Sequence, residues 1–131
     1  MAMGIILIVP VKDYRHLDMN DPFVLAYGLA GAPIIETLIF QAFPVWIARK
    51  CKARLPDQVL ASLVPFAVAH LTAGLATAMD AGLVGGFYFA FTYAHWRVQS
   101  RWTAFWTTAL SHALHNGAAV AMFAIANGLK P

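Results

Sequence analysis

Four long stretches in which charged residues are almost absent restrict the folds open to this chain. They run from about Phe23 to Ala48, Val59 to Ala78, Gly82 to Trp96 and Trp102 to Gly128. A helix that crosses a bilayer needs about 17–25 mostly apolar residues. Because backbone groups in lipid must be hydrogen-bonded internally, helices are the expected structure. We therefore predict an all-α, polytopic membrane protein with a four-helix transmembrane core.

The composition supports a bilayer as the natural solvent. Hydrophobic residues make up 60% of the chain and charged residues 11%, against roughly 45–50% and about 25% in soluble domains. So few charges could not cover the surface of a soluble protein. The formal net charge of +3 does not indicate a nucleic-acid partner, because the cations lie in short clusters beside the apolar stretches.

Those clusters also predict orientation. Loops rich in Lys and Arg stay in the cytoplasm, so both chain termini are expected on the non-cytoplasmic side of a membrane, most simply the bacterial inner membrane. Residues 1–22 are expected to form a short interfacial segment, and residues 23–131 the four-helix domain. The basic residues that carry this prediction are Arg49, Lys50, Lys52, Arg54, Arg97 and Arg101.

Proline and glycine predict where the helices begin, bend and end. Pro56 and Asp57 are typical of a helix start, and the second helix is expected to begin there. The sequence "MDAG" at residues 79–82 predicts a tight turn between the second and third helices. Pro33 and Pro44 predict a kinked or broken first helix.

Ionisable and amide side chains lie near the middle of three of these stretches. They are Glu36, His70, His112 and Asn116. A charge at mid-membrane costs about 2.5–3.5 kcal/mol on insertion scales, and a shared polar cluster lowers that cost through mutual hydrogen bonds. We therefore expect these side chains to converge at one depth.

Helical spacing adds detail to this cluster. His112 and Asn116 are four residues apart and share a face, as do Phe66 and His70. A carboxylate facing an imidazole can activate a water molecule as a general base. A second imidazole with an amide can stabilise an oxyanion. A purely structural polar network is the alternative reading, and His115 is expected to be structural or to border the cluster.

These residues resemble the motifs of the CPBP superfamily of intramembrane endopeptidases, which includes CAAX prenyl endopeptidases and bacteriocin-processing (Abi-type) enzymes. Members carry EExxxR, FxxxH and HxxxN motifs on successive helices of a four-helix core. Here FxxxH is Phe66 to His70, and HxxxN is His112 to Asn116. The first motif departs from the pattern, since only Glu36 is kept, and Thr37 and Gln41 replace the second glutamate and the arginine.

The resemblance implies an intramembrane glutamate-type endopeptidase that hydrolyses a membrane-associated peptide or protein. Glu36 and His70 would activate the water, and His112 with Asn116 would stabilise the tetrahedral oxyanion. Phe66, Thr37, Gln41 and His115 are candidate accessory residues.

Two other readings stay open. The altered first motif also fits a catalytically degenerate small membrane subunit that binds or scaffolds a partner, within a larger membrane complex. A small metal- or cofactor-binding bundle, with His112 or His115 as an axial ligand, is the third. Any zinc or iron would be held by Glu36, His70 and His112. A metal-free mechanism is preferred, because Asn116 is a poor ligand and a good oxyanion donor.

Overall fold

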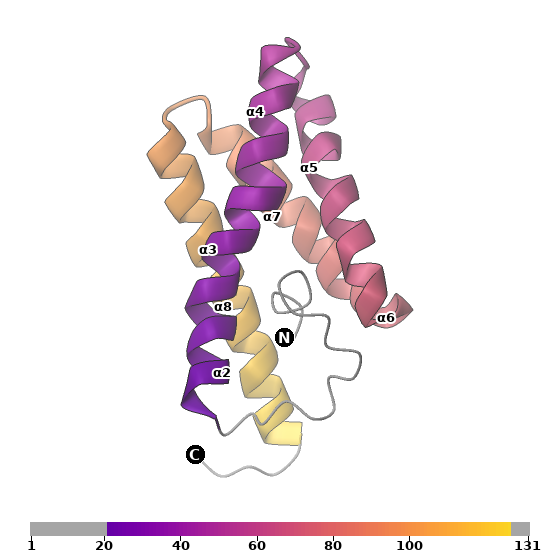
Figure 1. Ribbon diagram of the computed structural model, residues 1–131, viewed down its shortest axis with the longest axis vertical. Coiled ribbons are helices and arrows are strands. Elements are labelled where there is room, and N and C mark those ends of the chain that lie inside the picture. The colour runs from indigo at the N-terminus through magenta and orange to yellow at the C-terminus, as the bar shows by residue number, and fades with distance from the viewer. Residues whose placement is uncertain (1–20, 127–131) are drawn as a thin grey trace.

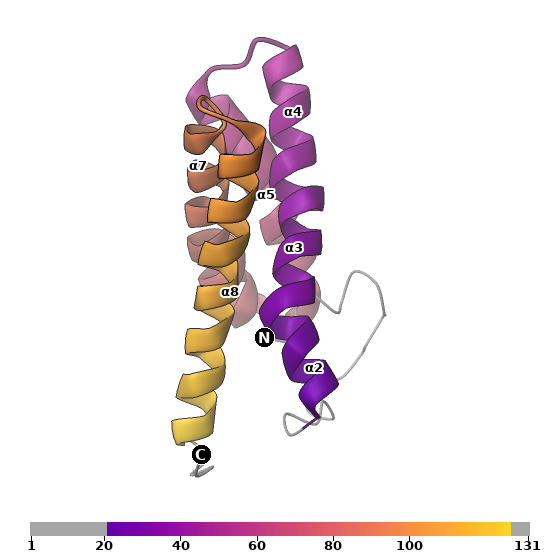
Figure 2. The same ribbon diagram turned by 90° about the vertical axis from the view of Figure 1, so that its left-hand side faces the viewer.

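The structure, a computed structural model, describes residues 21–126, and these residues form an up-and-down bundle of helices (Figures 1 and 2). The first helix runs without interruption over Pro22–Lys50. Its successive segments are α2 (Pro22–Ala26), η2 (Tyr27–Gly31), α3 (Ala32–Glu36), η3 (Thr37–Ala42) and α4 (Phe43–Lys50).

Three further helical stretches complete the bundle over the described residues. The second comprises α5 (Leu55–His70) and η4 (Leu71–Ala73). The third comprises α6 (Leu75–Thr77), η5 (Ala78–Gly85) and α7 (Gly86–Trp96), and the fourth is α8 (Arg101–Ala126). The all-helical prediction is confirmed for this part of the chain.

Of the predicted kink or break in the first helix, the break is wrong. Asp21 caps its start, with Oδ1 accepting a hydrogen bond from the backbone N–H of Phe23 at 2.8 Å. The π-helical segments η2 and η3 lie just before Pro33 and Pro44, respectively. Proline removes one backbone donor and crowds the carbonyl four residues earlier. A widened π-helical turn ahead of each ring relieves that crowding while the helix continues.

The predicted turn at residues 79–82 is also wrong, because those residues lie inside η5. The chain turns instead at Gly74, where φ is 105° and the N–H donates to the Leu71 carbonyl at 3.0 Å. Glycine adopts this left-handed backbone without the penalty that a Cβ would bring. The third helical stretch therefore begins at Leu75, earlier than predicted.

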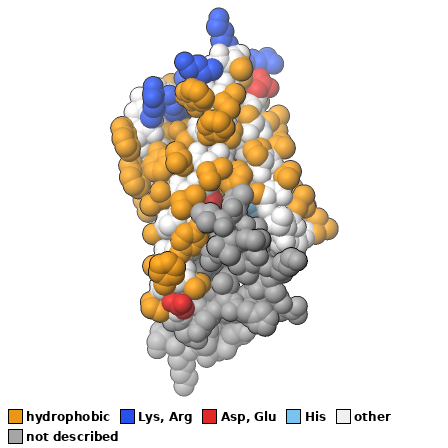
Figure 3. All heavy atoms as spheres, viewed as in Figure 1, with side chains coloured by type: hydrophobic (Ala, Val, Ile, Leu, Met, Phe, Trp, Pro, Cys, Tyr) orange, Lys and Arg blue, Asp and Glu red, His pale blue; other side chains and the backbone are white. Residues whose placement is uncertain are grey.

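Two apolar clusters fill the bundle. One is made of Phe40, Phe66 and Phe89. The other lies toward the end at which α4 ends and α5 begins, and consists of Val45, Val59, Ala90, Tyr93, Ala94 and Ala104. Lys and Arg side chains gather at this same end, which we call the basic end, while apolar side chains cover much of the visible surface below it (Figure 3).

One helix among the described residues, Pro22–Lys50, is long and apolar enough to cross a membrane by length and composition. The four-span arrangement stays a prediction. The predicted interfacial segment, residues 1–22, lies almost wholly outside the described residues.

Close packing at Gly86 generates a stability prediction. A Cβ at this position would lie 2.6 Å from Cδ1 of Phe66 and 3.2 Å from Cδ1 of Leu63. Because these are core side chains, we expect Gly86→Ala to lower the free energy of unfolding in detergent by about 1–3 kcal/mol, as overpacking does.

Gly117→Ala is the matched control. The nearest atom to its Cβ would be Leu29 Cδ2 at 3.8 Å, an ordinary contact. Alanine is favoured over glycine in helices, so this variant should be unchanged or more stable. Equal destabilisation by the two substitutions would contradict the packing described at Gly86.

Candidate functional site

Three ionisable side chains are buried inside the bundle, each on a different helix. Glu36 ends α3, His70 ends α5, and His112 lies within α8. Their exposed fractions are 2%, 2% and 3%, respectively. Buried ionisable groups are costly and are found where they have partners. All three side chains are thus in the interior, but His70 ends its α-helix instead of lying in the middle of a longer one, because the chain turns at Gly74.

Glu36 and His112 face each other across the first helix and α8. Glu36 Oε2 lies 3.6 Å from His112 Nε2. This separation is longer than an ordinary hydrogen bond, and the contact is an ion pair only when the imidazole is protonated. The carboxyl group and the imidazole are thus neighbours across the two helices.

The orientation of His70 is set by the backbone of its own helix. Its Nδ1 lies 2.7 Å from the carbonyl oxygen of Phe66. A carbonyl can only accept, so Nδ1 carries the hydrogen and donates it. In the neutral imidazole the lone pair is then on Nε2. Nε2 is buried and has no hydrogen-bond partner within residues 21–126.

Aromatic rings hold both imidazoles in place. The Phe66 ring lies 4.2 Å from that of His70 and 5.8 Å from that of His112, between centroids. Phe89 stacks on His112 at 4.3 Å. Phe66 was singled out by its spacing from His70. Phe89 was missed, because it lies in an aromatic-rich segment in which the sequence does not distinguish one ring from the next.

Asn116 lies one turn beyond His112 on α8. Its Nδ2 donates to the backbone carbonyl of Gly28 at 2.9 Å, so one of its two amide hydrogens ties α8 to η2. The sequence did not predict this contact. His115 is half-buried, and its ring packs edge-on against Phe89 at 5.8 Å.

Thr37 and Gln41, which replace the charged residues of the first motif, are both wholly buried. Ser62 and Thr108 are equally buried. Ser62 precedes Phe66 by one turn, and Thr108 precedes His112 by one turn. None of the four side chains has a hydrogen-bond partner among the described residues. The sequence did carry a signal for two of them. Ser62 lies four residues before Phe66 and Thr108 four residues before His112, so each shares a helix face with a motif residue.

A shared metal site does not emerge from the geometry. Within residues 21–126, no group of three or more His, Cys, Asp or Glu side chains is arranged to hold one metal ion. Glu36, His70 and His112, the ligand set considered from the sequence, are thus not gathered as such a set.

Comparison with known proteins identifies the family. Residues 19–118 match the family described as type II CAAX prenyl endopeptidase Rce1-like. No curated protein and no solved structure matches the chain. The matched range includes Glu36, His70, His112 and Asn116 and covers most of the chain. The chain therefore belongs to the Rce1-like family of type II CAAX prenyl endopeptidases.

Proposed function

We propose that the protein is an intramembrane glutamate-type endopeptidase that hydrolyses a membrane-associated peptide or protein. The observation that carries this proposal is the contact between Glu36 and His112, 3.6 Å apart, in the interior of the bundle beside His70. A general base and imidazoles in a buried site are the groups that amide hydrolysis requires. Family membership supports the same chemistry.

In the proposed reaction, the Glu36 carboxylate takes a proton from a water molecule. At the same time, the oxygen of that water bonds to the carbonyl carbon of the peptide. The carbonyl π electrons move to oxygen and form a tetrahedral oxyanion. Collapse of this intermediate breaks the C–N bond, and the proton held by Glu36 passes to the leaving amine. No metal ion takes part in this scheme.

The surrounding side chains have distinct proposed tasks. His70 Nε2 can accept a hydrogen bond from the attacking water, because Nδ1–H is committed to the Phe66 carbonyl. His112 and the second amide hydrogen of Asn116 donate to the oxyanion. Donors that are already positioned stabilise developing charge without reorganisation.

All four helical stretches are proposed to cross a membrane, with the basic end in the cytoplasm. The start of the first helix and the end of α8 would then both lie on the opposite side. Each stretch exposes large apolar side chains that lipid would cover. Examples, taken from the first helix, α5, α7 and α8 in turn, are Leu38, Phe43, Val64, Val68, Phe87, Phe91, Leu110 and Leu114. A bacterial inner membrane fits this topology.

A second candidate function is a non-catalytic membrane subunit that binds a partner in a larger complex. The observation that favours it is the neutral pair Thr37 and Gln41, which is buried where the family has two charges. An enzyme that had lost those charges could keep its fold while losing substrate positioning.

Activity measurements separate these two functions. With protein in lipid nanodiscs and a prenylated CAAX peptide as the probe, we expect Glu36→Gln to reduce kcat by roughly 100-fold or more, the usual contribution of a general base. His112→Gln should also lose activity. His115→Gln is the comparison variant and should lose much less activity, because the His115 ring contacts Phe89, whereas His112 faces Glu36.

Cleavage by Glu36→Gln at the wild-type rate would disprove the glutamate mechanism. If the wild-type protein cleaves no peptide and purifies from membranes with a stoichiometric partner, the result supports the non-catalytic subunit instead.

The hydrogen bond of His70 predicts a spectroscopic signature. Nitrogen NMR of histidine-labelled protein should show the His70 imidazole protonated on Nδ1 and unprotonated on Nε2, because the Phe66 carbonyl can only accept. Comparison with His70→Gln assigns the signal. A resonance pattern with the hydrogen on Nε2 would remove the proposed acceptor for the water.

The altered first motif predicts coupling between two positions. Thr37→Glu alone buries an unpaired charge, and we expect a loss of about 3 kcal/mol in unfolding free energy. Adding Gln41→Arg, four residues further on, should recover at least about 1 kcal/mol through pairing. Strictly additive losses in chemical denaturation would show that these two positions do not face each other.

A further inference from the structure

We propose that a groove between the first helix, the end of α7 and the start of α8 binds an anionic membrane phospholipid, with its phosphate on Arg97 and Arg101. The groove has a volume of about 440 Å³. An adjoining hollow of about 450 Å³ shares Leu38, Ala42, Tyr93 and Arg101 and extends it along α8. None of the proposed catalytic residues lines either one.

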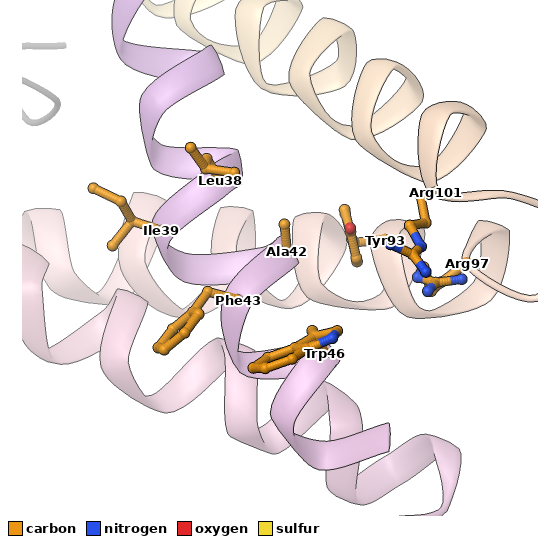
Figure 4. Close-up of a pocket in the computed structure, with 8 residues that line it drawn as sticks. All are labelled: Leu38, Ile39, Ala42, Phe43, Trp46, Tyr93, Arg97 and Arg101. Carbon is orange, nitrogen blue, oxygen red and sulfur yellow. The ribbon is translucent and has the colours of Figure 1, made fainter. Parts of the chain in front are cut away.

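One wall of the groove is apolar and belongs to the first helix. It is formed by Leu38, Ile39, Ala42, Phe43 and Trp46 (Figure 4). Leu38 and Phe43 are 57% and 58% exposed, respectively. From Leu38 to Trp46 the helix rises about 12 Å, close to the ~15 Å thickness of hydrocarbon in one leaflet. The wall thus matches an acyl chain in length and chemistry.

The other end of the groove is cationic. Arg97 and Arg101 line it together with Tyr93 (Figure 4). Among residues 21–126, neither guanidinium forms an ion pair with a carboxylate, and Asp57, the acidic side chain in the first turn of α5, is paired with Arg54 at 3.8 Å. Two guanidinium groups free to bind are suited to a phosphate, which they can contact with paired hydrogen bonds.

A peptide is a poorer match for this groove. Each residue of an extended peptide brings a backbone donor and an acceptor that must be satisfied when water is excluded. The polar atoms that line the groove belong to two arginines, one tyrosine and the indole N–H of Trp46, all toward the same end (Figure 4). A ligand with one anionic group and a hydrocarbon tail leaves no polar group unsatisfied along the apolar wall.

The location supports the same ligand. Arg97 and Arg101 lie where α7 ends and α8 begins, which is the same end of the bundle as the end of α4 (Figure 1). Lipid phosphates would lie there if the first helix spans the bilayer. Basic pockets between membrane helices commonly hold anionic headgroups. The inference rests on the proposed membrane placement and not on the proposed hydrolysis by Glu36.

Lipid retention tests the inference. Protein is placed in nanodiscs of phosphatidylglycerol and phosphatidylcholine and then released into a mild detergent. Native mass spectrometry measures the mass of the protein with its bound lipid. We expect wild-type protein to retain one phosphatidylglycerol. Arg97→Gln with Arg101→Gln should weaken retention by roughly tenfold or more, the effect of losing charge-assisted hydrogen bonds.

Arg49→Gln with Lys52→Gln is the matched control, since it removes the same charge from the same end of the bundle outside the groove. It should retain phosphatidylglycerol, as should Glu36→Gln. Equal loss in the control, no preference for phosphatidylglycerol, or equally effective competition by inorganic phosphate alone would each overturn the proposal. Unchanged lipid retention in the Arg97/Arg101 variant, together with a raised KM for the prenylated peptide, would also overturn it. That result would assign the groove to substrate binding.

Thermal denaturation of every variant in detergent distinguishes lost binding from lost folding. Retention of phosphatidylglycerol by Glu36→Gln would support the groove even if the wild-type protein shows no peptidase activity. The lipid test and the test of the catalytic site can therefore fail separately.

Discussion

The burial of the Glu36 carboxylate is the constraint around which the bundle is organised. A carboxylate at 2% exposure inside an apolar bundle is stable only with partners supplied by other helices. His112 comes to 3.6 Å from it, and Phe66 and Phe89 hold the neighbouring imidazoles. The inward faces of α5, α7 and α8 thus place Phe66, Phe89 and His112 around this one polar side chain of the first helix.

The first helix makes this arrangement feasible because it is continuous. Two π-helical segments accommodate Pro33 and Pro44, so the helix delivers Glu36 and Gly28 to the same partner, α8, without a break. The Asn116 amide closes this contact by bonding to the Gly28 carbonyl. π-Helical turns are frequent at functional sites, and η3 begins directly after Glu36.

Much of this arrangement could be predicted from sequence, for identifiable physical reasons. Apolar stretches and mid-helix polar residues carry strong periodic signals, so the helices and the convergence of Glu36 with His112 were accessible. The turn was misplaced because "MDAG" resembles a turn locally, whereas Gly74, which supplies the positive φ, lies within apolar sequence. Phe89 and Gly28 could not be predicted, since their contacts depend on how helices pack and not on local pattern.

Thr37 and Gln41 form a neutral, buried layer directly after Glu36 in the first helix. Among the described residues Glu36 is the buried carboxyl group, its neighbour is His112, and the proposed catalysis depends on that contact.

A double-mutant cycle on unfolding free energy, with Glu36→Gln, His112→Gln and both together, tests that contact most directly. The structure predicts a coupling energy of about 1 kcal/mol or more, as for side chains in contact. Additivity within about 0.5 kcal/mol, the behaviour of independent sites, would contradict it.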